Sequence, residues 1–379
     1  MLNSYQIDLL KKERRALHAN PEISGQEYAT QERIFRFLQT YTTAEVKKVG
    51  GTGVLASFDS KVIGQHTLIR GDIDALPIQE INTFEHRSRF EGVSHKCGHD
   101  GHAAILLGLA LSLTEKPIQK GKVWLIFQPA EEDGRGAKAV MADEHFAHQH
   151  FDFVFALHNL PGYPKNQIVV KEGAFTSEVK SIIIKLHGKT SHAAEPEKGY
   201  NPALMLAQIL LYAEENTNNQ PASDDFFLMT PVNMSMGSKD YGISAGYGEL
   251  HLTLRAWSTD LMDKKCSELE KYISLKSKEH HLTLEIEWLQ EFFSNQNNKE
   301  AVKLIRSAAK HCALPLIETP TPFRWGEDFG VFTQKFKGAM FGIGAGENTP
   351  ALHNPDYDFP DDILPSSVGM FYEILNQLH

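Results

Sequence analysis

The sequence has few cysteines and no long apolar run. Three cysteines occur among 379 residues, too few for a disulfide framework in a chain of this length. The longest apolar stretch, residues 103–113, falls well short of the roughly 20 residues that a membrane-spanning helix needs. The first residues also lack the apolar core of a signal peptide. These absences favour a reducing compartment and predict a cytoplasmic protein.

Positive charge is scarce relative to negative charge. Lys and Arg total 38 against 48 for Asp and Glu, which gives a formal net charge of −10 at pH 7. Because an acidic surface repels phosphate groups, we expect neither nucleic acid nor a membrane as a partner. With 41% hydrophobic and 23% charged residues, the composition is that of an ordinary globular protein. The length accommodates two or three domains.

The first part of the chain predicts an α/β fold. Short, almost continuously apolar runs alternate with helical patterns, and each run is flanked by Gly, Asp or Pro. Strands of this kind are typical of a sheet that helices cover on both faces. The runs occupy residues 53–58, 67–70, 122–127 and 151–157.

The pattern changes near Lys171. Residues 179–186 alternate in polarity and are rich in β-branched side chains, and a strand–helix–strand–helix–strand order follows. This order is typical of a small α+β domain. The end of the chain returns to the first pattern. We therefore predict a discontinuous larger domain, residues 1–175 and 292–379, with an α+β domain, residues 176–291, inserted in it.

The densest cluster of chemically active side chains is the run SHKCGHDGH, residues 94–102. Cys97 and His99 lie two residues apart, so in an extended loop both side chains point the same way and can reach one metal ion. The other interpretation is a His-rich surface loop with an incidental cysteine. The spacing alone leaves both interpretations open.

Three further groups follow predicted strands. The pair Glu131-Glu132, then His158, then His353 each come after a strand-like run. Functional groups of open α/β sheets gather at the carboxyl ends of strands, and of two adjacent carboxylates one can bind metal while the other handles protons. Taken singly, each group also has a plain structural explanation, because Glu pairs are usually solvated and single histidines are common.

Asp72, Asp74 and His192 have undecided roles. The two aspartates end another strand-like run. They fit metal ligands, acceptors that orient a metal-bound imidazole, or a strand-terminating turn, in which Asp is common. His192 lies between a predicted strand and a predicted helix of the inserted domain. From the residues alone, an ordinary loop position is favoured over an electrophilic donor.

Several longer motifs follow one another along the chain: RGDIDALPIQE, HKCGHDGH, FQPAEE, TSHAAEPEKGYNPA, WGEDF and LHNPDYDFPDD. Together they resemble the amidohydrolases of the M20 metallopeptidase family over nearly the whole chain. That subgroup includes hippurate hydrolases, indole-acetyl-amino-acid hydrolases and N-acetyl-diaminopimelate deacetylases. The resemblance implies a zinc-exopeptidase-like catalytic domain with an inserted ferredoxin-like lid domain. It also implies a homodimer formed through the lid domains.

The resemblance further implies the chemistry. It predicts a metal-dependent hydrolase that uses a metal-activated water to release an amino acid from an N-acyl conjugate, a small-molecule substrate. Glu131 would act as general base and acid, and His192 would steady the oxyanion. Two divalent ions, which by their ligand set are Zn, Mn, Co or Ni, would be held by Cys97 as the bridge and by His99, Glu132, His158 and His353.

Two alternatives remain at this point. A dipeptidase or aminoacyl exopeptidase would need an acidic partner for the substrate amine, and Glu327 and Asp328 are candidates. A non-catalytic, metal-dependent binding homologue is expected to lack a ligand or the base, yet every matched residue is present. The chain departs from the family pattern at residues 242–249 and 325–326, where substrate side chains are expected to bind. The acyl group and the amino acid therefore stay open.

Overall fold

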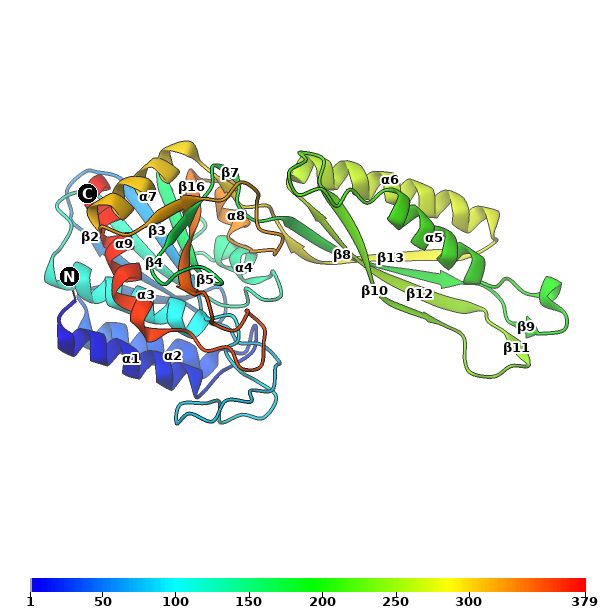
Figure 1. The fold of residues 1–379 in the computed structure, drawn as a ribbon, viewed down its shortest axis with the longest axis horizontal. Helices are drawn as coiled ribbons and strands as arrows, with labels where there is room; N and C mark the ends of the chain where they lie inside the picture. Colours follow the sequence, from blue (N-terminus) through cyan, green and yellow to red (C-terminus); the bar gives the residue numbers. More distant parts are fainter. Residues whose placement is uncertain (1) are drawn as a thin grey trace. The chain divides into compact units, whose positions relative to one another are not determined.

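The computed structural model describes residues 2–379, which form two compact units. The first unit takes Met1–Phe175, Asn295–Pro320 and Glu327–His379, and the second takes Thr176–Ser294 and Thr321–Gly326. Figure 1 shows the chain leaving the first unit and later returning to it. The second unit therefore interrupts the first in the sequence, and it also includes a short segment from much later in the chain.

The second unit includes two segments beyond the predicted residues 176–291. Its strand β13 (Thr283–Phe292) continues past residue 291. The segment Thr321–Gly326 docks on the start of the unit, because the N–H of Ser177 donates to the carbonyls of Phe323 at 3.0 Å and Trp325 at 3.2 Å. Such a long-range attachment leaves no trace in the local sequence pattern.

An eight-stranded mixed sheet forms the centre of the first unit. Its strands are β1 (Glu45–Val49), β2 (Gly53–Asp59), β3 (His66–Asp72), β4 (Lys122–Gln128), β5 (Phe153–Pro161), β6 (Ile168–Val170), β15 (Leu316–Glu318) and β16 (Gly338–Gly346). They follow the order β1-β2-β4-β3-β5-β16-β6-β15. β3 pairs in parallel with β4 and β5, and β16 pairs in parallel with β5. The four central strands are almost wholly buried, which confirms a sheet covered on both faces.

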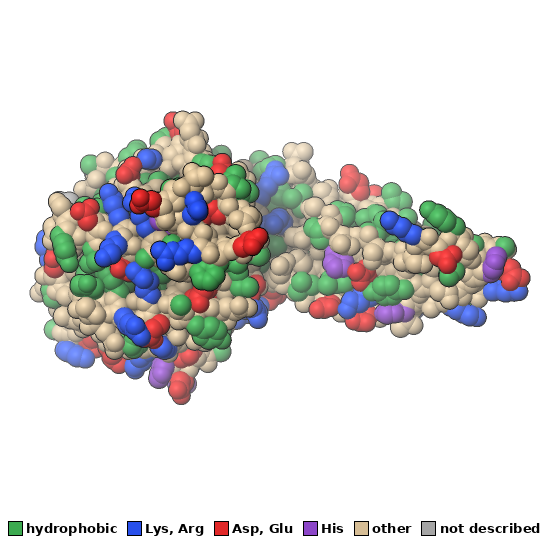
Figure 2. Space-filling view, turned by 90° about the horizontal axis from the view of Figure 1, so that it is seen from below, with side chains coloured by type: hydrophobic (Ala, Val, Ile, Leu, Met, Phe, Trp, Pro, Cys, Tyr) green, Lys and Arg blue, Asp and Glu red, His purple; other side chains and the backbone are tan. Residues whose placement is uncertain are grey.

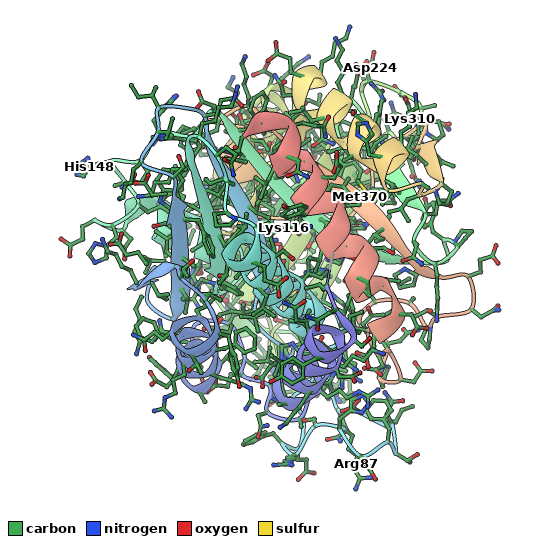
Figure 3. The ribbon with its side chains drawn as sticks, turned by 90° about the vertical axis from the view of Figure 1, so that its left-hand side faces the viewer. Arg87, Lys116, His148, Asp224, Lys310 and Met370 are labelled. Atoms are coloured by element: carbon green, nitrogen blue, oxygen red, sulfur yellow. The ribbon has the colours of Figure 1, made fainter. Side chains whose placement is uncertain are left out.

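Helices cover the two faces of this sheet (Figure 1). One layer contains α1 (Ser4–His18), α2 (Tyr28–Tyr41), α3 (His99–Glu115), α7 (Lys299–His311) and α9 (Leu364–Leu378). The other contains the short helices α4 (Gly136–Ala142) and α8 (Gly330–Thr333). Figure 3 shows the first layer from outside, with α9, which carries Met370, in front of the sheet.

Helix α3 lies in the interior of the first unit. Every residue from His99 to Leu113 is buried, as expected for a helix that is apolar on all faces. Gly101 allows a close approach, because a Cβ there would lie 2.2 Å from the ring of Phe359. Within residues 2–379, no helix combines the length and the apolar composition that crossing a membrane requires.

The second unit is an antiparallel sheet with two helices on one face. In the order β10-β12-β8-β13, its strands are β10 (Phe227–Met236), β12 (Tyr247–Ala256), β8 (Glu178–His187) and β13, and its helices are α5 (Ala203–Glu215) and α6 (Thr259–Glu279). Ile182, Ile184 and Leu186 alternate along β8 and pack in the core below the helices. The predicted α+β character is therefore confirmed.

Short elements complete both units. In the second unit, β9 (Ser191–His192) pairs with β11 (Ile243–Ser244), and a 3-10 turn, η1, spans Pro196–Lys198. In the first, β7 (Gly173–Ala174) pairs with β14 (Gln296–Asn297), and η2 spans Asp361–Ile363. On the face of the first unit that Figure 2 shows, charged side chains of both signs are interspersed. This mixture is typical of an ordinary solvated surface.

Candidate metal centre

The predicted site residues gather where parallel strands of the first unit end. Asp72 is the last residue of β3, and Glu131 and Glu132 follow β4. His158 lies inside β5, three residues before the strand ends. Because β3 pairs in parallel with both β4 and β5, these positions share one edge of the sheet.

Cys97 and His99 flank a left-handed glycine. Gly98 has a φ of 94° and immediately precedes α3, so His99 is the first residue of that helix. The extended loop predicted for residues 97–99 is therefore wrong, although both side chains still reach the same place. A Cβ at position 98 would lie 2.5 Å from Oδ1 of Asn159. Both the backbone conformation and the available space thus require glycine.

Two groups of candidate ligands share Cys97. The ligand atoms of Cys97, His99 and His158 lie within 4.8 Å of one another, and so do those of Cys97, Glu132 and His353. Sγ of Cys97 is 3.6 Å from Nε2 of His158. Oε1 of Glu132 is 3.8 Å from Nε2 of His99 and 3.7 Å from Nε2 of His353. All five residues therefore converge, and Cys97 is the member common to both groups.

Hydrogen bonds orient two of the imidazoles. Nδ1 of His99 lies 3.1 Å from Oδ1 of Asp74, and Nδ1 of His158 lies 2.9 Å from the carbonyl of Asn159. Nε2 of His99 and Oε1 of Glu132 are buried, and within residues 2–379 neither has a hydrogen-bond partner. Buried polar atoms are rarely left unpaired, and a metal ion would satisfy both. Thiolate, imidazole and carboxylate are a donor set that zinc and related transition metals accept.

The charge balance also favours a cation. Burial, reinforced by the nearby carboxylate of Glu132, raises the pKa of the Cys97 thiol well above its ordinary value. Burial raises the pKa of Glu132 to about 8. Burial and then the charge of Glu327 raise the pKa of Glu131 well above its ordinary value. The site thus contains several buried acidic groups and little positive charge. A divalent cation would offset the negative charge that these groups carry when they lose their protons, and it would favour the deprotonated forms.

Glu131 is buried beside these ligand groups and is only 5% exposed. Its Oε1 accepts a hydrogen bond of 3.3 Å from the N–H of Asp328. The side chain of Asp328 is itself fixed, because it accepts from Arg70, from Gln128 and from the N–H of Ala137. The orientation of Glu131 therefore depends on a rigid buried segment rather than on solvent.

Asp74 orients two candidate ligands at once. One of its oxygens, Oδ1, faces the ring of His99, while Oδ2 accepts from the N–H of Glu132 at 2.9 Å and from the hydroxyl of Ser24 at 2.7 Å. Carboxylates that fix the ring of a metal-binding histidine commonly occupy this position. Of the three roles left open by the sequence, the structure favours an orienting acceptor for Asp74.

Arg70 is buried among three carboxylates. Its guanidinium pairs with Asp72, with Glu327 at 2.7 Å and with Asp328 at 2.8 Å. Asp72 also faces Nδ1 of His102 and lies 3.7 Å from Nε2 of His99. Because Glu327 and Asp328 already face Arg70, they are poorly placed to bind the amine of a dipeptide substrate.

His192 belongs to β9 in the second unit, and its side chain is exposed. Its Nδ1 accepts a hydrogen bond of 3.0 Å from the N–H of Ala194. A neutral imidazole carries one proton, so this bond places that proton on Nε2. The exposed ring therefore presents an N–H donor.

Sequence reasoning missed several buried groups around the centre. His102 lies three residues after His99 on α3, a spacing that puts both on one face of a helix, so a signal was available. Arg14 and His18 of α1 gave no such signal, because each contacts Asp100 from more than 80 positions away: the separations are 86 and 82 residues.

A sheet layered between helices, an inserted α+β unit and two ligand groups that share a thiol agree with the metal-dependent hydrolase that the sequence motifs imply. Comparison with known proteins agrees. The family model "Peptidase family M20/M25/M40" matches residues 68–377. The chain belongs to this family.

Characterised relatives are similar over almost their whole length. The N-acetyl-L-cysteine deacetylase of Bacillus subtilis (strain 168) is 28% identical over 383 residues, covering 99% of this chain and 90% of the relative. The N-acetyldiaminopimelate deacetylase of Geobacillus sp. (strain WCH70) is 31% identical over 352 residues, covering 90% of each. Among solved structures, the Bacillus subtilis YXEP protein, described as a dinuclear metal binding peptidase from the M20 family, matches with a TM-score of 0.84. It is 26% identical, and the match covers 98% of both chains.

Proposed function

We propose that this protein is a metal-dependent amidohydrolase that releases an amino acid from an N-acyl amino acid. The observation that carries the proposal is the pair of ligand groups sharing Cys97 beside the buried carboxylate of Glu131. The names of the relatives support the substrate class, since they include two deacetylases of N-acetylated amino acids and the hippurate hydrolase of Campylobacter jejuni, which is 28% identical over 372 residues.

Two divalent ions would occupy the centre, with Cys97 as the ligand they share and with His99, Glu132, His158 and His353 as the others. Bound there, such ions supply Lewis acidity for the amide carbonyl and lower the pKa of water. Zn, Co, Ni and Mn all fit the donor set. Metal analysis of the purified protein by mass spectrometry decides among them.

Glu131 would handle the protons of the reaction. It accepts a proton from the attacking water and returns it to the leaving nitrogen, because an amine departs far more readily than an amide anion. The hydrogen bond from the N–H of Asp328 holds the carboxylate in place for both steps. His192 would act as a donor to the oxyanion through Nε2–H, the tautomer that its bond to Ala194 favours.

Glu131→Gln tests this proposal. The amide keeps the size of the side chain but cannot accept a proton, so turnover of N-acetyl amino acids should fall by roughly 100-fold or more. Metal content should stay at the wild-type level, because Glu132 is the proposed ligand. A variant that still hydrolyses the substrates at the wild-type rate would contradict the role of Glu131.

The same assay separates the alternatives. A dipeptide that matches the preferred N-acetyl amino acid should be the poorer substrate, because Glu327 and Asp328 are occupied by Arg70. Preference for the dipeptide would instead favour an exopeptidase. Metal-loaded protein that binds a broad panel of N-acyl amino acids but cleaves none would favour a non-catalytic homologue.

We also propose a homodimer formed through the second unit, which would serve as a lid. Strand β10 lies at the edge of its sheet, beside β12. Val232, Met234 and Met236 on it are 61%, 56% and 42% exposed, and an exposed apolar edge tends to pair with another strand. Light scattering should detect a dimer that Met234→Lys dissociates, while Leu275→Lys, a comparable change on the exposed face of α6, leaves it intact. A cytoplasmic location stays a prediction.

A further inference from the structure

His353 is the candidate ligand with the least local support. It lies in the loop between β16 and η2, and its side chain is 53% exposed, whereas those of His99 and Glu132 are 0% and 12% exposed. Its φ is 66°, a left-handed conformation that residues other than glycine adopt at a cost. Contacts from outside the loop would help to hold this conformation.

Lys96 supplies contacts of this kind. Its carbonyl accepts a hydrogen bond of 2.7 Å from the N–H of His353 itself. Its ammonium group donates to the carbonyl of Tyr357, four residues further along the same loop, at 2.8 Å. Lys96 directly precedes Cys97 in the sequence, so one residue connects the segment that carries the shared thiol to the loop that carries His353.

The buried ammonium is anchored on its other side by Glu80. Nζ of Lys96 lies 2.6 Å from Oε1 of Glu80, and the lysine side chain is 0% exposed. Glu80 is held in turn by Nε2 of His18 at 3.0 Å and by the N–H of Ser88 at 2.6 Å. Because Lys is almost never fully buried without a partner, this arrangement is specific.

We propose that Lys96 is a positioning residue for the metal centre, which holds the His353 loop against the segment that begins at Cys97. The inference rests on the proposed two-ion centre. It assigns Lys96 to one of the two ion positions, the one that includes His353, because the ammonium donates to the carbonyl of Tyr357 in the His353 loop and to Glu80. Neither of these two contacts of the ammonium involves a member of the group of Cys97, His99 and His158.

The test measures the affinity of each ion separately. Metal-free protein is titrated with Zn²⁺ in competition with a chromophoric chelator. In Lys96→Met, which keeps the aliphatic stem, one of the two ions should bind roughly 10- to 100-fold more weakly, as for other residues that orient ligands. The other ion should bind nearly as in the wild type. His353→Ala should weaken the binding of the same ion. Adding Lys96→Met to the His353→Ala variant should cause little further loss of affinity.

Two controls separate positioning from lost stability. Lys96→Met leaves the charge of Glu80 without one of its partners. The double variant Lys96→Met/Glu80→Gln removes both charges, and it should still bind the same ion more weakly. Leu125→Ala, which opens a cavity in the buried strand β4, should lower the unfolding temperature without changing either affinity.

Three results would overturn the inference. The first is that Lys96→Met weakens the binding of both ions equally, and the second is that it weakens the binding of neither. The third is that Lys96→Met/Glu80→Gln restores normal binding. A wild-type protein that binds no pair of ions would instead overturn the proposed function itself, and the inference with it.

Discussion

Replacing Arg70 by methionine should destabilise the first unit strongly and in a pH-dependent way. The guanidinium is fully buried, and it is the cation that Asp72, Glu327 and Asp328 share. Methionine fills a similar volume but leaves the carboxylates without their counter-ion. Breaking a buried ion pair from one side costs about 3–5 kcal/mol, which corresponds to a fall in Tm of roughly 6–20 °C.

The pH dependence follows from the two acids whose pKa values are already high. Burial raises the pKa of Asp328 to about 7, with the neighbouring Glu327 adding to the rise while Arg70 opposes it, and burial also raises the pKa of Glu327. An acid with a raised pKa in the folded state binds more protons folded than unfolded, so stability falls as pH rises between its unfolded and folded pKa values. Without Arg70 both pKa values rise further. The loss of stability should therefore be larger at pH 8 than at pH 5.5.

The assay is thermal unfolding of the metal-free protein at both pH values. The matched control is Arg33→Met, because Arg33 pairs with Glu13 at 2.8 Å but its side chain is 40% exposed. An exposed pair of that kind contributes about 0–1 kcal/mol. The reasoning would be refuted if Arg70→Met cost no more than this control, or if its effect were the same at both pH values.

Three further predictions concern the proposed chemistry. Cys97→Ala should lower the metal content of the purified protein, since both ligand groups include this thiol; two tightly bound ions in that variant would exclude a bridging role. His192→Ala should lower kcat more than it raises KM, by roughly 10²- to 10³-fold in kcat, and an effect on KM alone would make it a simple binding residue. Gly98→Ala should reduce stability and metal binding together, because a Cβ there meets Asn159 and the φ of 94° is unfavourable for alanine; near-normal unfolding and metal content would contradict this.

Much of the fold follows from local sequence patterns. The runs that became β2 to β5 are apolar at nearly every position because both faces of these strands are covered, and the alternation in β8 reflects a sheet with one covered face. The five candidate ligands were proposed because they stand in short motifs that resemble those of the M20 family. These are properties of short segments, so they can be read without knowing which segments meet.

What surrounds the centre could not be predicted in this way. Asp328 reaches Arg70 across 258 positions and Tyr357 reaches Lys96 across 261, and no local pattern encodes such a pairing. The hydrogen bond that holds the backbone of His353 in its left-handed conformation likewise comes from outside its loop, from the carbonyl of Lys96. The candidate ligands could therefore be named from the sequence, but the residues that hold them in position could not.

The route of the chain through residues 321–326 limits how the protein can be dissected. Phe175 and Asn295 are joined by a backbone hydrogen bond of 2.8 Å, so excising residues 176–294 and splicing the two ends looks like a simple way to isolate the catalytic half. That deletion would strip Thr321–Gly326 of Ser177, the residue on which it docks, and leave a loose aromatic segment directly before Glu327. A usable truncation would have to replace this segment as well, with a short polar linker in place of Phe323 and Trp325.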